Sequence, residues 1–142
     1  MPTRTANAVW EGDLKEGKGK VALGSGSFEG SYGFASRFED GKGTNPEELI
    51  GAAHAGCFSM ALANMLAQSG SPANRIDTKA SVKIEKVAEG FRITSIELTT
   101  RGEVPGIDEK TFLEHAEKAK TDCPVSQALK GTEIRLQAKL AE

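Results

Sequence analysis

The chain has 142 residues and a mass of 15.0 kDa, which is the length of one domain with a single buried core. Apolar residues make up 38% and charged residues 27%, which argues against a disordered or fibrous chain. The net charge is −2, from 18 basic and 20 acidic residues without a Lys/Arg cluster, so the composition disfavours a nucleic-acid-binding protein. The first residues lack the apolar segment of a signal peptide, and we expect a cytoplasmic protein.

The first third of the sequence predicts three strands. Residues 5–10 and 19–23 are strand-like, and the glycine- and serine-rich segment after residue 17 predicts a hairpin. The alternation from Tyr32 to Phe38 predicts a third strand. In that strand Arg37 would leave the face opposite the aromatic side chains.

Residues 45–68 carry the clearest helix signal. Asn45 suits the N-cap, Pro46 the first helical position, and Glu48 the position of a capping-box acid. A Ser-Gly-Ser-Pro run then ends the helix near Gln68. Its sides are almost all small or apolar, which is typical of a central helix covered on most faces. The polar residues within it favour a core helix over a membrane span.

The second half predicts a hairpin, two helices and a closing strand. Residues 78–87 and 91–100 alternate as an antiparallel hairpin with one face in water. Helices at 108–120 and 123–130 and a strand at 133–140 complete one α+β domain over residues 1–142. The residues expected to face inward are Ala80, Val82, Ile84, Phe112, Leu113 and Ala116.

The two cysteines, Cys57 and Cys123, are the most informative residues. In a reducing compartment such a pair is more often free, metal-bound or redox-active than a permanent bridge. By itself, Cys57 in the middle of an apolar helix is typical of a small buried hydrophobe. Cys123 precedes Pro124 at a helix start, where backbone N–H groups favour a thiolate.

The histidines allow two alternatives for these cysteines. His54 lies three residues before Cys57, on the same side of the helix. Together with His115 and Cys123 this pair could hold zinc, but the spacing is not specific. A Cys–His hydrolase dyad is the other alternative, and it gives Cys123 no role. We therefore expect neither a metal nor a cofactor.

A long motif narrows these alternatives. The run from Gly43 to Met60, GTNPEELIGAAHAGCFSM, closely resembles the motif of the osmotically inducible protein C (OsmC) family, relatives of the organic hydroperoxide resistance proteins. The RFE segment at Arg37 and the DCPVS segment around Cys123 resemble the same family. The resemblance extends from Trp10 to the closing strand and favours the OsmC branch.

This resemblance implies a thiol-dependent peroxidase on an α+β fold, with antiparallel sheets around a long apolar helix in an intertwined homodimer. By position, Cys57 matches the peroxidatic cysteine and Cys123 the resolving cysteine. Arg37 and Glu47 match the pair that activates the peroxidatic thiol. The implied substrate is an organic hydroperoxide, with hydrogen peroxide a weaker one, and the implied reductant is an external dithiol. No nucleic-acid or membrane partner is implied.

The residue types suit this chemistry. Burial raises the pKa of a thiol, whereas a nearby guanidinium favours the thiolate. A carboxylate can orient that guanidinium through two parallel hydrogen bonds. Without the resemblance, Arg37 would be an exposed strand residue and Glu47 a helix-start acid. A stress-induced binding or structural protein without turnover also stays open as a function.

The spacing of Glu47 and Cys57 bears on the dimer. They are ten residues apart on the predicted helix, which corresponds to about 15 Å along its axis and directions that differ by about 80°. If two such helices pack antiparallel about a two-fold axis, the start of one approaches the middle of the other. We therefore predict that Arg37 and Glu47 serve Cys57 of the partner chain.

Overall fold

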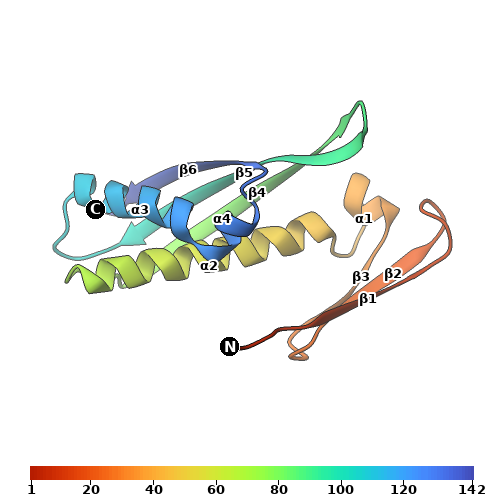
Figure 1. Cartoon of the computed structure of the whole chain (residues 1–142), viewed down its shortest axis with the longest axis horizontal. Coiled ribbons are helices and arrows are strands. Elements are labelled where there is room, and N and C mark those ends of the chain that lie inside the picture. The colour runs from red at the N-terminus through yellow and green to blue at the C-terminus, as the bar shows by residue number, and fades with distance from the viewer. The chain divides into compact units, whose positions relative to one another are not determined.

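The computed structural model describes every residue from Met1 to Glu142. The residues form two compact units, Met1–Leu49 and Ile50–Glu142. Two three-stranded sheets and four helices confirm the predicted α+β class (Figure 1). The assignment of residues 1–142 to a single domain stays a prediction.

The first unit contains an antiparallel sheet of β1 (Ala6–Glu11), β2 (Lys18–Leu23) and β3 (Glu29–Tyr32). The first two strands confirm the predicted ones to within a residue. Gly19 on β2 pairs with both Trp10 and Tyr32, whose ring centroids lie 5.4 Å apart. A Cβ atom at Gly19 would lie 2.5 Å from either ring, so the packing of these two aromatic residues requires glycine there.

The predicted third strand is wrong beyond Tyr32, because residues Phe34–Phe38 form a short helix, α1. The Ser36 hydroxyl accepts a hydrogen bond from the Gly33 amide (2.9 Å) and donates to the Gly33 carbonyl (3.2 Å), which fixes the first turn. Phe34 and Phe38 pack with ring centroids 5.1 Å apart. Residues four apart share a face in a helix and in a strand, so this short alternation could not separate the two.

The long helix α2 (Pro46–Gln68) begins and ends where predicted. The Asn45 side-chain oxygen accepts a hydrogen bond from the Glu48 amide at 2.7 Å, as an N-cap does. Glu48 does not complete the expected capping box. Its carboxylate instead accepts a hydrogen bond from the Thr44 hydroxyl at 2.7 Å, so the helix start is tied to the preceding bridge with β3.

The second unit is built on a sheet of β4 (Arg75–Val87), β5 (Gly90–Glu103) and β6 (Glu133–Leu140). The β4–β5 hairpin is antiparallel as predicted, but β6 runs parallel to β5, so the expectation of purely antiparallel sheets is wrong. Helices α3 (Glu109–Asp122) and α4 (Pro124–Ala128) form the crossover that a parallel pair needs. Figure 1 shows α2 and α3 on the same side of this sheet.

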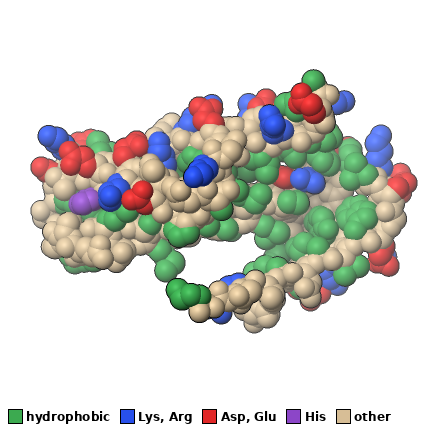
Figure 2. Space-filling view, in the orientation of Figure 1, with side chains coloured by type: hydrophobic (Ala, Val, Ile, Leu, Met, Phe, Trp, Pro, Cys, Tyr) green, Lys and Arg blue, Asp and Glu red, His purple; other side chains and the backbone are tan.

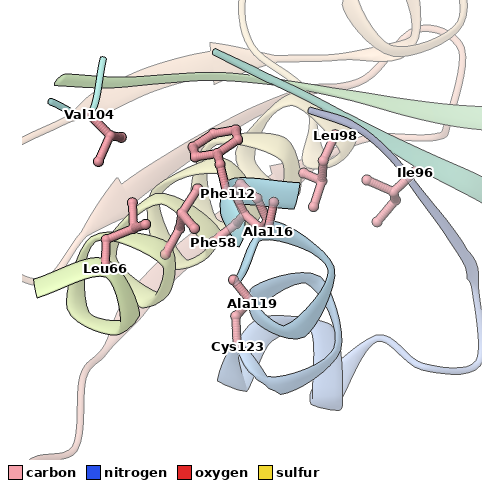
Figure 3. Close-up of a cluster of buried hydrophobic side chains, with 10 residues drawn as sticks. Phe58, Leu66, Ile96, Leu98, Val104, Phe112, Ala116, Ala119 and Cys123 are labelled. Carbon is pink, nitrogen blue, oxygen red and sulfur yellow. The ribbon is translucent and has the colours of Figure 1, made fainter. Parts of the chain in front are cut away.

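The core of the second unit lies between the sheet and these helices. Figure 3 shows side chains from α2, β5 and α3 converging there. Ala80 and Val82 pack against the core as predicted, whereas Ile84 is half-buried outside this cluster; Phe112 and Ala116 are fully buried. The fully buried hydrophobic side chains are Phe58, Leu62, Leu66, Ile96, Leu98, Phe112, Ala116, Ala119 and Cys123.

Leu113, predicted to face inward, is exposed instead. The buried stripe of α3 runs through Phe112, Ala116, Ala119 and Cys123, at intervals of three or four residues. One residue further along a helix is a rotation of about 100°, which carries Leu113 off this stripe.

Charged side chains of both signs are spread over the surface. Figure 2 shows acidic and basic side chains mixed over the visible face, without a large patch of one sign. Many belong to ion pairs within one strand, such as Arg75–Asp77 and Arg101–Glu103.

Helix α2 is less covered than its composition predicts. Phe58, Leu62 and Leu66 are fully buried, but the opposite face is open and Met60 is 76% exposed. By length and composition alone α2 could also cross a membrane, with a mean hydropathy of 1.4. Core helices of soluble proteins pass the same test, so this finding by itself assigns no membrane span.

Candidate active site

In the first unit, Arg37 and Glu47 form a two-point ion pair. Arg37 lies on α1 and Glu47 in the first turn of α2. Nε of Arg37 donates to Oε1 of Glu47 at 3.1 Å, and Nη2 donates to Oε2 at 2.9 Å. The Glu47 side chain is only 7% exposed, whereas that of Arg37 is 35% exposed. The buried carboxylate therefore fixes a guanidinium that can still reach a ligand.

An apolar cavity adjoins this ion pair in the first unit. Its volume is about 260 Å³, and Trp10, Tyr32, Phe34, Phe38 and Leu14 line it together with Arg37. The Arg37 guanidinium carbon lies 5.3 Å from the centroid of the Phe38 ring. One cation at the wall of an apolar cavity suits a ligand with a hydrocarbon body and a polar end.

In the second unit, the two cysteines lie side by side. Cys57 is half-buried on α2, and Cys123 is buried where α3 ends and α4 begins. Both are free thiols, Cys57 packs against the buried cluster that contains Cys123, and the Cys123 side chain is close enough to raise the pKa of the Cys57 thiol. Residues that are 66 positions apart in the sequence (123 − 57) therefore meet through the packing of the crossover helices against α2.

The surroundings of Cys57 disfavour its thiolate. Burial raises the pKa of the Cys57 thiol above its ordinary value. The backbone amide of Val125 lowers this pKa by hydrogen bonding to the sulfur, but the adjacent Cys123 side chain raises it again. None of the groups that shift this pKa is an Arg or a Lys. The net effect of these groups is to disfavour the Cys57 thiolate, whereas a reactive thiolate is favoured by a nearby cation.

Cys123 is held by polar contacts with the next helix. Its sulfur accepts a hydrogen bond from the Ser126 amide at 3.3 Å, as expected at a helix start. The Ser126 hydroxyl lies 3.3 Å from the same sulfur and 2.7 Å from Nε2 of His54 on α2. His54, Ser126 and Cys123 are all buried.

The sequence indicated no role for Ser126, and for His54 it suggested only a metal ligand or a dyad base. Their spacing carried a usable signal. His54 lies three residues before Cys57, and Ser126 lies three after Cys123, so each polar side chain shares a helix face with a cysteine. The alternative zinc site is not assembled, since no group of three or more His, Cys, Asp or Glu side chains is placed to hold a metal.

The four predicted site residues thus form two pairs. Arg37 pairs with Glu47 in the first unit, and Cys57 contacts Cys123 in the second. Each pair combines groups that suit thiol chemistry: a fixed guanidinium in one case and a potential dithiol in the other.

The sequence and the fold place the chain in a known family. Residues 39–138 match the model of the OsmC-like protein family, which covers more than half of the chain. The chain therefore belongs to the OsmC-like protein family.

Individual relatives extend this match. The chain is 54% identical over 138 residues to the Peroxiredoxin OsmC of Escherichia coli strain K12, covering 96% of each chain. It is 37% identical over 92 residues to the organic hydroperoxide resistance protein of Xanthomonas axonopodis pv. citri, covering 64% of this chain and 63% of that one. The crystal structure of the organic hydroperoxide resistance protein OhrB of Bacillus subtilis has the same fold, with a TM-score of 0.68 and 23% identity over 96% of this chain and 98% of that one.

Proposed function

We propose that this chain is a thiol-dependent peroxidase that reduces organic hydroperoxides, and hydrogen peroxide more weakly, in defence against oxidative or osmotic stress. The observation that carries the proposal is the contact between its only two cysteines, Cys57 and Cys123. The relatives named Peroxiredoxin OsmC and organic hydroperoxide resistance protein support the same chemistry. We expect the protein to act in the cytoplasm, where external dithiols are available.

In the first step, the Cys57 thiolate attacks the outer oxygen of the hydroperoxide. The S–O bond forms as the O–O bond breaks, and the bonding electrons leave with the alkoxide, which takes up a proton to become the alcohol. Cys57 becomes a sulfenic acid, so its sulfur is oxidised while the peroxide is reduced. This step needs the thiolate, which the surroundings of Cys57 in its own unit disfavour.

In the second step, the Cys123 sulfur attacks the Cys57 sulfenic acid. An S–S bond forms, the S–OH bond breaks, and the hydroxide leaves as water after taking up a proton. The product is an intrachain disulfide that an external dithiol reduces to restore both thiols. The contact between the two side chains supports this step, because attack requires the sulfurs to meet.

Arg37 supplies the cation that the first step needs. The Glu47 carboxylate accepts hydrogen bonds from Nε and Nη2 of Arg37, so Nη1 of Arg37 is not used in this ion pair. A guanidinium beside Cys57 favours the thiolate and can donate to the peroxide oxygens. The apolar cavity next to Arg37 suits the hydrocarbon part of an organic hydroperoxide, which supports an organic substrate over hydrogen peroxide.

The active protein is a homodimer in which Arg37 and Glu47 serve Cys57 of the partner chain. Ten residues of the continuous helix α2 separate Glu47 from Cys57, or about 15 Å along the axis. The open face of α2, which includes Ala53, Gly56 and Met60, offers an apolar surface for a second copy. Small residues on that face permit close approach of two helices.

Replacing each cysteine separately tests the proposed function. The Cys57→Ser variant should consume no cumene hydroperoxide. The Cys123→Ser variant should consume one equivalent and keep a sulfenic acid that dimedone traps. Continued turnover of the Cys57→Ser variant with dithiothreitol would overturn the assignment of Cys57, and first reaction at Cys123 would reverse the two roles.

A further inference from the structure

Three buried polar side chains of the second unit are connected to one another next to its hydrophobic core. The connection runs from His54 on α2 through Ser126 on α4 to Cys123 at the junction of α3 and α4. His54 and Cys123 have no exposed surface, and Ser126 is 3% exposed. The surrounding cluster consists of residues such as Phe58 and Leu62, which offer no hydrogen bonds.

The hydrogen bonds of His54 are incomplete. Its Nε2 atom lies 2.7 Å from the Ser126 hydroxyl, while its buried Nδ1 atom has no hydrogen-bond partner. Buried polar atoms are nearly always paired, because an unpaired one destabilises the fold. An apolar side chain would fill this position without that penalty, so packing alone does not account for an imidazole here.

The contacts of Ser126 give the imidazole a route to one sulfur. Its hydroxyl can accept from the Cys123 thiol and donate to His54 at the same time, since a hydroxyl has one donor and two acceptor sites. The Ser126 amide also donates to the Cys123 sulfur, which favours a negative charge there. The geometry therefore connects a neutral imidazole to the proton of the buried thiol.

We propose that His54 is a positioning residue that accepts the Cys123 proton through the Ser126 hydroxyl and so prepares Cys123 to attack the oxidised Cys57. The inference rests on the proposed function, in which Cys123 is the resolving cysteine. It assigns His54 and Ser126 to the second chemical step and not to the reaction with peroxide.

The proton and electron transfers of this step balance. The thiol proton of Cys123 moves to the Ser126 oxygen as the Ser126 hydroxyl proton moves to Nε2 of His54, which leaves a thiolate and an imidazolium. The thiolate forms the S–S bond with Cys57, and the S–OH bond breaks with its electrons on the hydroxide. That hydroxide takes up one proton, and His54 returns to its neutral form when it releases one. Cys57 sulfenic acid and Cys123 thiol thus yield a disulfide and water.

The burial of His54 suits this role. Desolvation lowers the pKa of the imidazole below its ordinary value, so the ring is neutral near pH 7 and Nε2 can act as an acceptor. The charged imidazolium is therefore short-lived in the core. This favours passing the proton on after each turnover.

Single-turnover kinetics on the full-length chain test this proton transfer from Cys123 through Ser126 to His54, which we call the relay. Reduced protein is mixed with one equivalent of cumene hydroperoxide. The loss of peroxide measures the first step. Acid quenching followed by thiol alkylation measures disulfide formation. For Ser126→Ala and His54→Gln we expect an unchanged first step and slower disulfide formation, on the order of a hundredfold, as for loss of general base catalysis. Ser126→Thr keeps a hydroxyl and should restore the wild-type rate.

Two matched controls separate the relay from a general loss of packing. Ser59→Ala removes a half-buried hydroxyl of α2 that bonds to Thr78 at 2.8 Å, and His115→Gln changes the other histidine of the chain. Both should leave both steps unchanged.

The possible failures are distinguishable. Disulfide formation at the wild-type rate in folded Ser126→Ala and His54→Gln proteins would overturn the relay, and so would an equal loss of both steps. Peroxide loss in the wild type without any oxidation of Cys57 would instead overturn the proposed function. Thermal unfolding of each variant identifies the folded proteins, and the two variants provide independent tests because they truncate different side chains.

Discussion

Single residues illustrate why the site could be found only in part from the sequence. Cys57, Cys123, Arg37 and Glu47 could be named because a long motif carries them. The partner of each residue depended on tertiary structure. The hydrogen bond between His54 and Ser126 joins residues 72 positions apart, and no helical or strand periodicity predicts such a contact.

At the residue scale, Arg37→Lys should impair the first chemical step. A lysine cannot keep both hydrogen bonds to Glu47 and still offer a fixed donor, because its charge is a point on a flexible stem. We expect the rate constant of Cys57 with cumene hydroperoxide to fall on the order of a hundredfold, as for loss of an oriented donor. Stopped-flow kinetics measure it.

Arg75→Lys is the matched control for that substitution. Arg75 forms an exposed ion pair with Asp77 at 3.1 Å, and neither residue takes part in the proposed reaction. Its substitution should leave the rate constant unchanged. An Arg37→Lys protein with wild-type kinetics would show that the guanidinium has no role in activating the thiol.

His54 also makes a prediction about stability and pH. Burial lowers the pKa of folded His54 below its ordinary value of 6.5, so on acidification the unfolded chain binds a proton first. The free energy of unfolding should therefore fall as the pH drops below about 7, with a slope of at most about 1.4 kcal/mol per pH unit for one proton. The loss should level off once folded His54 is protonated.

Urea unfolding between pH 8 and pH 5 measures this dependence. The His54→Gln variant should lose this part of the pH dependence, whereas His115→Gln should keep it. Equal acid sensitivity of the wild type and His54→Gln would contradict the assignment of a buried neutral imidazole.

At the scale of elements, long periodic segments were predictable and short ones were not. The 23 residues of α2 and the alternating strand β4 provide many repeats of their periods. The five residues of α1 do not, and a side-chain contact between Ser36 and the Gly33 backbone decided their conformation. The parallel pairing of β6 with β5 depends on the path of α3 and α4 between the two strands. The residues of β6 alone do not predict the direction of the strand.

The packing of helix α3 against the sheet should depend strongly on one aromatic side chain, Phe112. Phe112 is fully buried and lies against Gly102 of β5, where an added Cβ atom would approach the ring to 2.5 Å. Phe112→Ala should lower the free energy of unfolding by about 3–5 kcal/mol through lost burial and a cavity. Chemical denaturation measures this loss.

The adjacent Leu113→Ala substitution is the control on the same helix. Leu113 is 36% exposed, so its truncation should change the free energy of unfolding by no more than about 1 kcal/mol. Equal destabilisation by the two substitutions would contradict the placement of the buried stripe of α3.

At the scale of the whole molecule, the sequence predicts a homodimer, and two features of the single chain bear on this prediction. The composition of α2 predicts cover on most faces, yet Met60 is 76% exposed. Burial disfavours the Cys57 thiolate, and the groups that shift its pKa include no cation. The proposed partner chain, which would cover α2 and supply Arg37, would account for both features.

Mixed dimers test the sharing of the site. Chains with Cys57→Ser and chains with Arg37→Ala and Glu47→Ala are each expected to be inactive. When the two are unfolded and refolded together, each heterodimer should regain one working site, with Cys57 from one chain and the ion pair from the other. Each chain refolded alone is the control. Verified heterodimers without activity would place the three groups in the same chain.

The central claim is that peroxide oxidises Cys57 and that Cys123 resolves it within the same chain. The most direct measurement is thiol titration and peptide mapping of the reduced protein before and after one equivalent of cumene hydroperoxide. We expect two free thiols per chain to be replaced by one intrachain Cys57–Cys123 disulfide, and a dithiol to restore both. Survival of both thiols after this dose would contradict the account.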